Sequence, residues 1–205
     1  MNAFFLSALV TLFVAIDPPG CAPIFAALVA GTPVAHQRSM AVRSTLIATL
    51  ILLGFALIGR AFLDYLGVSL AAFRLAGGAM LFLMALEMVF EKRQQRREAR
   101  ANDLSITEHE DISVFPMGMP MIAGPGAIVA VMLLMARTHN WPEKLAVIGA
   151  LASVLALILL SLLVSAPLMR LVGPKVEAVI SRILGMILAA LAAQFVLDGL
   201  NAGLH

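Results

Sequence analysis

The sequence predicts an all-α membrane protein with six transmembrane helices, arranged as two inverted three-helix repeats. Hydrophobic residues make up 61 % of the chain and charged residues only 13 %, whereas a soluble domain carries about 25 % charged residues. The mean hydropathy is +1.00. In addition, two apolar segments far apart in the chain are interrupted by similar proline–glycine motifs. Together these three observations predict a polytopic membrane protein built from related halves.

Six apolar segments are long enough to be membrane spans, since about 20 apolar residues cross the hydrocarbon core. They cover residues 3–30, 40–58, 69–90, 114–135, 145–164 and 176–200. Near their middles, the first and fourth segments contain Asp17-Pro18-Pro19-Gly20 and Gly124-Pro125-Gly126. Because proline inside a helix costs about 3 kcal/mol, we expect helices 1 and 4 to be broken mid-membrane.

The two halves of the chain match each other at an offset of 106 residues, at which Ile16 to Gly20 aligns with Ile122 to Gly126. We therefore divide the single membrane domain into a first three-span repeat (1–90), a connecting loop (91–113) and a second three-span repeat (114–205). Three is an odd number of spans, so the second repeat must enter the membrane from the opposite face. Inverted repeats with paired broken helices are typical of secondary transporters.

The distribution of basic residues predicts the orientation. The loops on one side receive ten Lys and Arg residues and those on the other side receive four. The more basic side is expected to be cytoplasmic. In a bacterium, this predicts a multi-pass protein with both termini periplasmic and the loop 91–113 cytoplasmic.

The two interruptions form the predicted binding site. Backbone groups that leave a helix inside the bilayer must be buried in protein or line a wet cavity. We expect a half-helix to restart after Gly20 and after Gly126 with its first amides free, which favours an anion at each start. Ala123 stands where the first half has Asp17. The site is therefore electrostatically asymmetric, which suits a zwitterion.

Asp17 is expected at membrane depth, where a charge costs about 2.5–3.5 kcal/mol on insertion scales. Its carboxylate could bind a substrate ammonium, carry a coupling proton, coordinate sodium, or cap the following half-helix. Glu87 is the second ion-coupling candidate, although its place in the last turn of the third span favours an interfacial position. Arg74 and Arg182 are expected to reach the headgroups; turned inward, they could pair with Asp17 or Glu87.

Other chemistries find little support in the sequence. The four histidines fall in predicted loops or at the terminus, and one cysteine allows no intrachain disulfide, so we expect no metal site. No nucleophile–base spacing suggests an enzyme. Basic residues lie between spans, where they report topology rather than nucleic-acid binding. The expected partners are the lipid bilayer and a small-molecule substrate, with no cofactor beyond a coupling H⁺ or Na⁺.

The paired motifs resemble those of the MarC family, whose members include the SnatA-type neutral amino acid transporters. The resemblance rests on Asp17-Pro18-Pro19-Gly20-x-x-Pro23 in the first span and Gly124-Pro125-Gly126-Ala127-Ile128 in the fourth. It implies a six-helix inner-membrane protein and, for some members, transport of glycine or alanine. It also implies a substrate site at Asp17, Pro18, Pro19, Gly20, Pro23, Gly124, Pro125, Gly126 and Ala127.

The leading hypothesis is secondary transport of small neutral amino acids by alternating access. Two alternatives remain open at this point. One is export of another small metabolite, and the other is an intramembrane enzyme or a structural partner protein without transport activity. The sequence shows no second catalytic carboxylate or histidine at membrane depth beside Asp17, which weakens the enzyme alternative.

Overall fold

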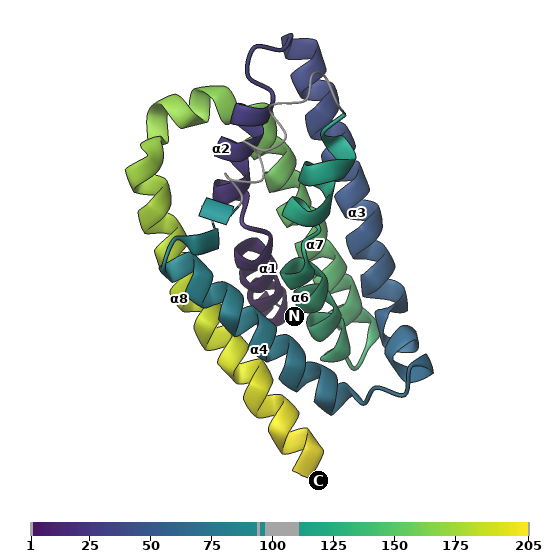
Figure 1. Cartoon of the computed structure of the whole chain (residues 1–205). Helices are drawn as coiled ribbons and strands as arrows, with labels where there is room; N and C mark the ends of the chain where they lie inside the picture. The colour runs from purple at the N-terminus through teal and green to yellow at the C-terminus, as the bar shows by residue number, and fades with distance from the viewer. Residues whose placement is uncertain (1, 94, 97–110, 205) are drawn as a thin grey trace.

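The computed structural model describes residues 2–93, 95–96 and 111–204, and these residues form helices and no strand (Figure 1). Five helices are long and apolar enough to cross a membrane, and a bent helix pair brings the number of candidate spans to six. The prediction of an all-helical membrane protein is therefore confirmed. Most of the predicted loop 91–113 lies outside the described residues.

The first half begins with α1 (Asn2–Ile16) and α2 (Pro18–Leu28), which are separated only by Asp17. α3 (Val34–Tyr65) and α4 (Leu70–Val89) follow. α3 is longer at both ends than the predicted span 40–58. Its ends carry charged side chains, which end an apolar pattern but do not end a helix, because helical backbone continues readily into headgroups and water.

The second half begins with η1 (Ser113–Ile122), an irregular helical segment whose backbone is extended at Phe115 and Met119. α6 (Pro125–Ala136) follows, and the two are bent by 52° at the predicted break. α7 (Trp141–Leu163) and α8 (Ser165–Leu204) complete the chain. The predicted spans leave residues 165–175 as a loop between the fifth and the sixth span. This prediction is wrong, because the backbone is helical there. Figure 1 shows this N-terminal part of α8 curving away from the straight part that follows.

The third helices of the two halves, α4 and α8, lie side by side and run antiparallel (Figure 1). Gly185 of α8 approaches Met88 near the end of α4, whereas Gly199 approaches Leu75 near its start. A Cβ atom added at Gly199 would lie 2.7 Å from the Leu75 backbone nitrogen. Glycines thus permit a backbone contact that no side chain would allow, as in many membrane helix pairs.

Several of the remaining contacts match under exchange of the two halves. α1 packs on α7 as η1 packs on α3, α2 packs on α7 as α6 packs on α3, and α2 packs on α8 as α6 packs on α4. Among the described residues, the contacts of α8 with α1 and α7 and of α6 with α7 have no counterpart of the same extent. The two halves are thus packed in a similar but not identical way. The inverted repeat itself stays a prediction.

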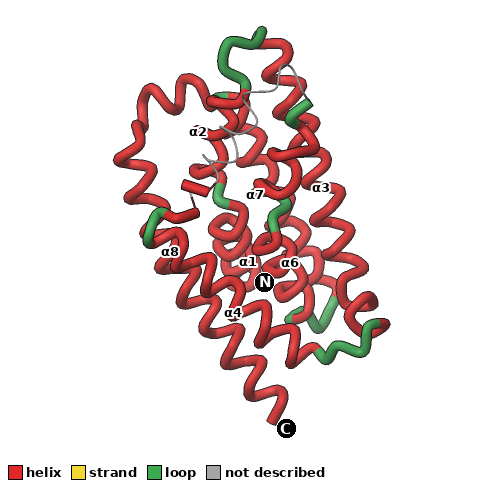
Figure 2. The backbone as a smooth tube through the Cα atoms, in the orientation of Figure 1, coloured by secondary structure: helices red, strands yellow, loops and turns green. Residues whose placement is uncertain are grey.

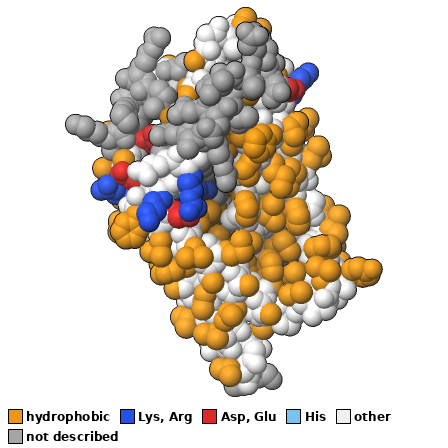
Figure 3. Space-filling model, in the orientation of Figure 1, with side chains coloured by type: hydrophobic (Ala, Val, Ile, Leu, Met, Phe, Trp, Pro, Cys, Tyr) orange, Lys and Arg blue, Asp and Glu red, His pale blue; other side chains and the backbone are white. Residues whose placement is uncertain are grey.

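Hydrophobic side chains cover much of the outer surface, as expected of helices in contact with lipid. In the face shown in Figure 3, charged side chains gather toward the upper end and hydrophobic ones cover the part below. Leu57 and Ile58 of α3 are 66 % and 63 % exposed. Figure 2 shows that the two interruptions lie within the helical bundle, away from the loops at its ends. Asp17 is buried at the first interruption, whereas Pro125 is exposed at the second, so the first break is enclosed by protein and the second borders open space.

Candidate functional site

The first interruption is closed by Asp17 itself. Asp17 has a left-handed backbone (φ 64°) and caps α2, with its Oδ1 accepting a hydrogen bond of 3.2 Å from the Gly20 amide. The Cys21 amide donates to the Asp17 carbonyl at 3.1 Å. Pro18 and Pro19 have no N–H to offer. The capping alternative for Asp17 is therefore confirmed, and the expectation of free amides at the start of α2 is wrong.

The other carboxylate oxygen of Asp17 faces Arg93, which follows the end of α4. Asp17 is only 2 % exposed, and its Oδ2 lies 3.9 Å from Nη1 of Arg93. Nη2 of Arg93 donates to the Ala15 carbonyl at 2.9 Å, and Nη1 approaches Sδ of Met88 at 3.1 Å. Ala15 lies in the last turn of α1, where carbonyls lack helical partners. Arg93 thus donates a hydrogen bond to a carbonyl at the end of α1 and also places its positive charge beside the acid at the break.

The second interruption is built differently. Gly124, at the N-cap of α6, has an extended backbone (φ −76°, ψ 166°), and no side chain of the described residues caps this helix. A Cβ atom at Gly124 would lie 2.5 Å from the Pro120 carbonyl oxygen, so close packing of the backbone explains the glycine. Pro125 occupies the first turn, where its missing N–H has no cost. The amides of Gly126 and Ala127 therefore start a helix that, within the described part of the chain, no side chain closes.

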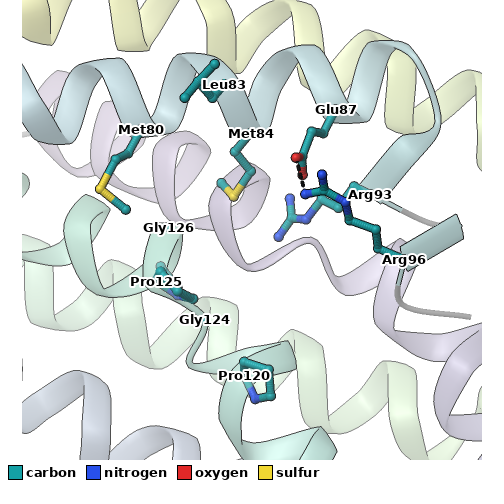
Figure 4. A pocket seen from close by; sticks show the side chains of 11 residues that line it. Met80, Leu83, Met84, Glu87, Arg93, Arg96, Pro120, Gly124, Pro125 and Gly126 are labelled. Atoms are coloured by element: carbon teal, nitrogen blue, oxygen red, sulfur yellow. Dashed lines mark hydrogen bonds and ion pairs between the residues drawn. The ribbon is translucent and has the colours of Figure 1, made fainter. Parts of the chain in front are cut away.

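A cavity of about 380 Å³ opens at this start of α6 (Figure 4). One wall comes from the second interruption and the other from α4. The first wall consists of Pro120, Gly124, Pro125, Gly126 and Ala127. The second wall consists of Met80, Leu83, Met84 and Glu87, and the remaining lining residues are Arg93 and Arg96. The cavity thus joins the interruption in one half to the third helix of the other half.

The predicted site residues therefore separate into two groups. Those of the second interruption and Glu87 line the cavity. The residues Asp17 to Pro23 are not among the lining residues, and Pro23 lies inside α2. Among the described residues, Arg93 connects Asp17 to the cavity, because it faces Asp17 and also lines the cavity.

The described residues that line the cavity include three charged side chains. Arg96 forms an ion pair with Glu87, whose side chain is 30 % exposed (Figure 4). Arg93 is more buried, with 13 % of its side chain exposed. The uncapped start of α6 adds the positive end of a helix dipole, equivalent to roughly half an elementary charge. The cavity can therefore meet both ends of a zwitterion, with the stronger attraction for its anionic end.

The sequence reasoning missed Arg93 and Arg96, which entered it only as basic residues of a loop. The sequence instead suggests Arg74 and Arg182 as possible partners of the acids. Arg74 donates to the Ala136 carbonyl at 3.2 Å, and Arg182 pairs with Glu91 at 2.7 Å. No local pattern marks Arg93, because its partners in α1 lie 78 residues away.

At the other end of α6, a polar cluster joins three helices. Arg137, the C-cap of α6, forms an ion pair with Asp198 of α8 and lies 4.0 Å from the centre of the Phe195 ring. Gln194 donates to Asp198 at 2.7 Å. The Arg74 contact with Ala136 brings the start of α4 into the same cluster. α6 is thus tied to α4 and α8 at one end and bordered by the cavity at the other.

Comparison with known proteins agrees with this architecture. The family model for the MarC family integral membrane protein matches residues 2–204. A UPF0056 membrane protein of Archaeoglobus fulgidus is 37 % identical over 97 % of this chain and 92 % of its own length. The UPF0056 inner membrane protein YhgN of Escherichia coli K12 is 33 % identical over 96 % and 95 %.

A further relative, the UPF0056 membrane protein YvbG of Bacillus subtilis, is 32 % identical over 98 % of this chain and 96 % of its own length. No solved structure gives a significant match to the chain. The names of these relatives describe membrane proteins and indicate no transported substrate. The family match and the relatives both extend over nearly the whole chain. The chain therefore belongs to the MarC family of integral membrane proteins.

Proposed function

We propose that the chain is a secondary transporter of small neutral amino acids such as glycine or alanine. The observation that carries this proposal is the cavity at the uncapped start of α6, with Arg93, Arg96 and Glu87 in its walls. A broken helix whose positive end faces a cavity is a recurring substrate site in transporters built from repeats. The cavity volume of about 380 Å³ falls within the range of ligand pockets, about 300–1,000 Å³.

In this proposal the substrate lies between α4 and the second interruption. Its carboxylate lies between the first amides of α6 and Arg93, which both line the cavity. Its ammonium turns toward Glu87, the acid among the lining residues. Asp17 acts at a distance, because it is buried behind Arg93. This changes the role first considered for Asp17, which was direct contact with the ammonium or the coupling ion.

Alternating access would come from rocking of one half against the other, driven by an H⁺ or Na⁺ gradient. The helix contacts that match between the two halves support such a division of the bundle. The polar cluster around Arg137 and Asp198 would close one end while the cavity is open at the other. Opening the closed end requires these contacts to break, so the two ends can open in turn.

Flux measurements in proteoliposomes test the proposal. The purified protein is reconstituted, and labelled glycine or alanine is followed under an imposed H⁺ gradient and, separately, an Na⁺ gradient. We expect gradient-driven accumulation above the level of empty liposomes. Absence of both uptake and efflux under both gradients would contradict the proposal. A protein partner that copurifies at fixed stoichiometry, together with absent flux, would favour the structural alternative.

We also propose that both termini face the periplasm and the loop 91–113 the cytoplasm. Cys21 is buried, so the native chain offers little background for thiol labelling. Single cysteines at the exposed positions Gln95 and Asn201 provide one probe for each side. In whole cells, an impermeant maleimide should label Asn201→Cys and leave Gln95→Cys unlabelled until the membrane is opened. The reverse labelling pattern would invert the proposed orientation.

A further inference from the structure

Arg93 lies between the buried acid of the first interruption and the cavity at the second. Its guanidinium donates to the Ala15 carbonyl at 2.9 Å and stands 3.9 Å from Oδ2 of Asp17. The same side chain lines the cavity (Figure 4). We propose that Arg93 recognises the carboxylate of the substrate, and that Asp17 is the positioning residue that holds Arg93 in place. This rests on the proposed transport function and adds that a carboxylate, rather than an amine, decides which solutes bind.

The orientation of Asp17 supports its role in positioning. Its Oδ1 is fixed by the hydrogen bond from the Gly20 amide, so Oδ2 points toward Arg93 in a set direction. At 3.9 Å the contact is longer than a hydrogen bond, and the two groups attract through charge. Asp17 and the end of α1 thus hold the guanidinium in place before a ligand binds. An arginine without such contacts would lose more side-chain entropy on binding.

The charges explain why a carboxylate is favoured. Arg96 is paired with Glu87, and Asp17 faces Arg93 with one carboxylate oxygen and accepts from the Gly20 amide with the other. A solute in the cavity lies between Arg93 and the uncapped start of α6, and both are positive. A guanidinium binds a carboxylate through two parallel hydrogen bonds. An amine without a carboxylate would meet these two positive groups, and the one acid among the described lining residues, Glu87, is already paired with Arg96.

The rest of the cavity limits the size and polarity of the solute. Met80, Leu83 and Met84 form the apolar part of the wall. Gly126 faces Met84 so closely that a Cβ atom there would lie 2.4 Å from its sulfur atom. The substrate class that fits is therefore small aliphatic carboxylates, with or without an α-amino group.

Competition experiments in proteoliposomes separate the carboxylate from the amine. Labelled alanine flux is measured with unlabelled propionate, which has only the carboxylate, and with alaninamide, which has only the amine. We expect propionate to inhibit the wild-type protein and alaninamide to have little effect at the same concentration. Equal or stronger inhibition by alaninamide would overturn the proposal.

Substitution of Arg93 tests the residue itself. Arg93→Gln should raise the KM for alanine about tenfold or more with a smaller change in kcat, and should abolish inhibition by propionate. Arg93→Lys should restore part of the affinity, because it keeps the charge but not the paired hydrogen bonds. The matched control is Arg182→Gln, which removes an arginine from an exposed ion pair outside the cavity and should leave KM unchanged. An unchanged KM in Arg93→Gln would contradict the proposal.

Thermal unfolding in detergent distinguishes failure of this inference from failure of the transport function. Propionate should raise the unfolding temperature of the wild-type protein and of Arg182→Gln, but not of Arg93→Gln or Arg93→Lys to the same extent. If alanine flux is absent while this protection is seen, the transport proposal fails and the carboxylate site stands. If flux is present and propionate protects all variants equally, the role of Arg93 is wrong. Arg93→Lys serves as the test if Arg93→Gln does not fold.

Discussion

The guanidinium of Arg137 and the carboxylate of Asp198 form an ion pair that ties the end of α6 to α8. The pair is partly buried, with 24 % and 31 % of the two side chains exposed, and Arg137 also stacks on Phe195. A polar contact of this kind loses more when one partner is removed than when both are, because the remaining charge is left without its partner. The ion pair should therefore show strong coupling between its two members.

We predict that Arg137→Gln and Asp198→Asn each lower the thermal stability of the protein in detergent. The double variant should be less destabilised than the sum of the two, with a coupling free energy within about 0.5–3 kcal/mol. Chemical unfolding of the four proteins of this cycle measures the coupling. Additive effects would show that the ion pair does not hold the two helices together. In proteoliposomes, both single variants should also alter the flux rate, because they weaken the contact that closes this end of α6.

Asp17 carries out two tasks that substitution can separate. Asparagine keeps an oxygen that can cap α2 and tolerates the left-handed backbone, whereas alanine does neither. We predict that Asp17→Asn folds with nearly wild-type stability, and that Asp17→Ala is destabilised by about 0.5–2 kcal/mol, the usual cost of losing an N-cap. Thermal unfolding of both variants measures the difference. Equal destabilisation by the two substitutions would show that the charge, and not the cap, stabilises this break.

The same pair of variants bears on transport. Asp17→Asn removes the charge that faces Arg93 while keeping the cap, so the guanidinium is held less firmly. We predict a higher KM for alanine in Asp17→Asn despite normal folding. Wild-type flux with wild-type KM in this variant would reduce Asp17 to a helix cap. Glu87→Gln is a useful comparison, since Glu87 lines the cavity directly and should affect binding without affecting the first interruption.

The sequence predicted the spans and both interruptions because these depend on local composition. Apolar length defines a span, and proline with glycine ends a helix wherever the chain lies. The helix bounds were less accurate at α3 and α8, where polar residues continue a helix that apolar patterns no longer reveal.

The charged partners in the site could not be predicted in the same way. Arg93 binds Ala15 and faces Asp17, and Arg137 pairs with a residue 61 positions later. Such contacts depend on the packing of α4, α6 and α8, and one sequence contains no local signal of them. The cap at Asp17 was foreseen as an alternative because it is local, and its consequence, a closed start of α2, required the structure.

Asp111, which precedes η1, allows a prediction on the pH dependence of stability. The hydrogen bond from the Ser113 hydroxyl lowers the pKa of Asp111 below its ordinary value of 3.8, and the Ser113 amide and the Arg43 guanidinium lower it further. A carboxyl whose pKa is lowered on folding stabilises the folded state above its unfolded pKa, and this contribution is lost as the pH falls toward the folded pKa.

The stability difference between the wild-type protein and Asp111→Asn should therefore be constant around pH 7 and decrease below about pH 4, since the unfolded carboxyl then binds a proton. The side chains of Asp111 and Arg43 are 49 % and 59 % exposed, so the contribution is small, about 0.2–1 kcal/mol. Thermal unfolding of both proteins across this pH range measures it. A difference that grows as the pH falls would contradict the assigned direction of the pKa shift.

Gly78 tests whether the close approach of α4 and α8 stabilises the bundle. A Cβ atom at Gly78 would lie 2.9 Å from the Ala192 carbonyl oxygen and 2.9 Å from the Val196 nitrogen, so it would meet backbone that cannot move aside. Gly54 of α3 is the matched control, because a Cβ atom there would have no neighbour within 4 Å.

In the middle of a helix, alanine is favoured over glycine by about 1 kcal/mol. Gly54→Ala should therefore leave the protein unchanged or slightly more stable. Gly78→Ala should instead lower stability by about 1–3 kcal/mol, as overpacking of a close contact does. Chemical unfolding in detergent compares the two variants directly. If Gly78→Ala proves as stable as Gly54→Ala, then α4 and α8 are separable at this point without loss, and their contact serves sliding or rocking rather than rigid packing.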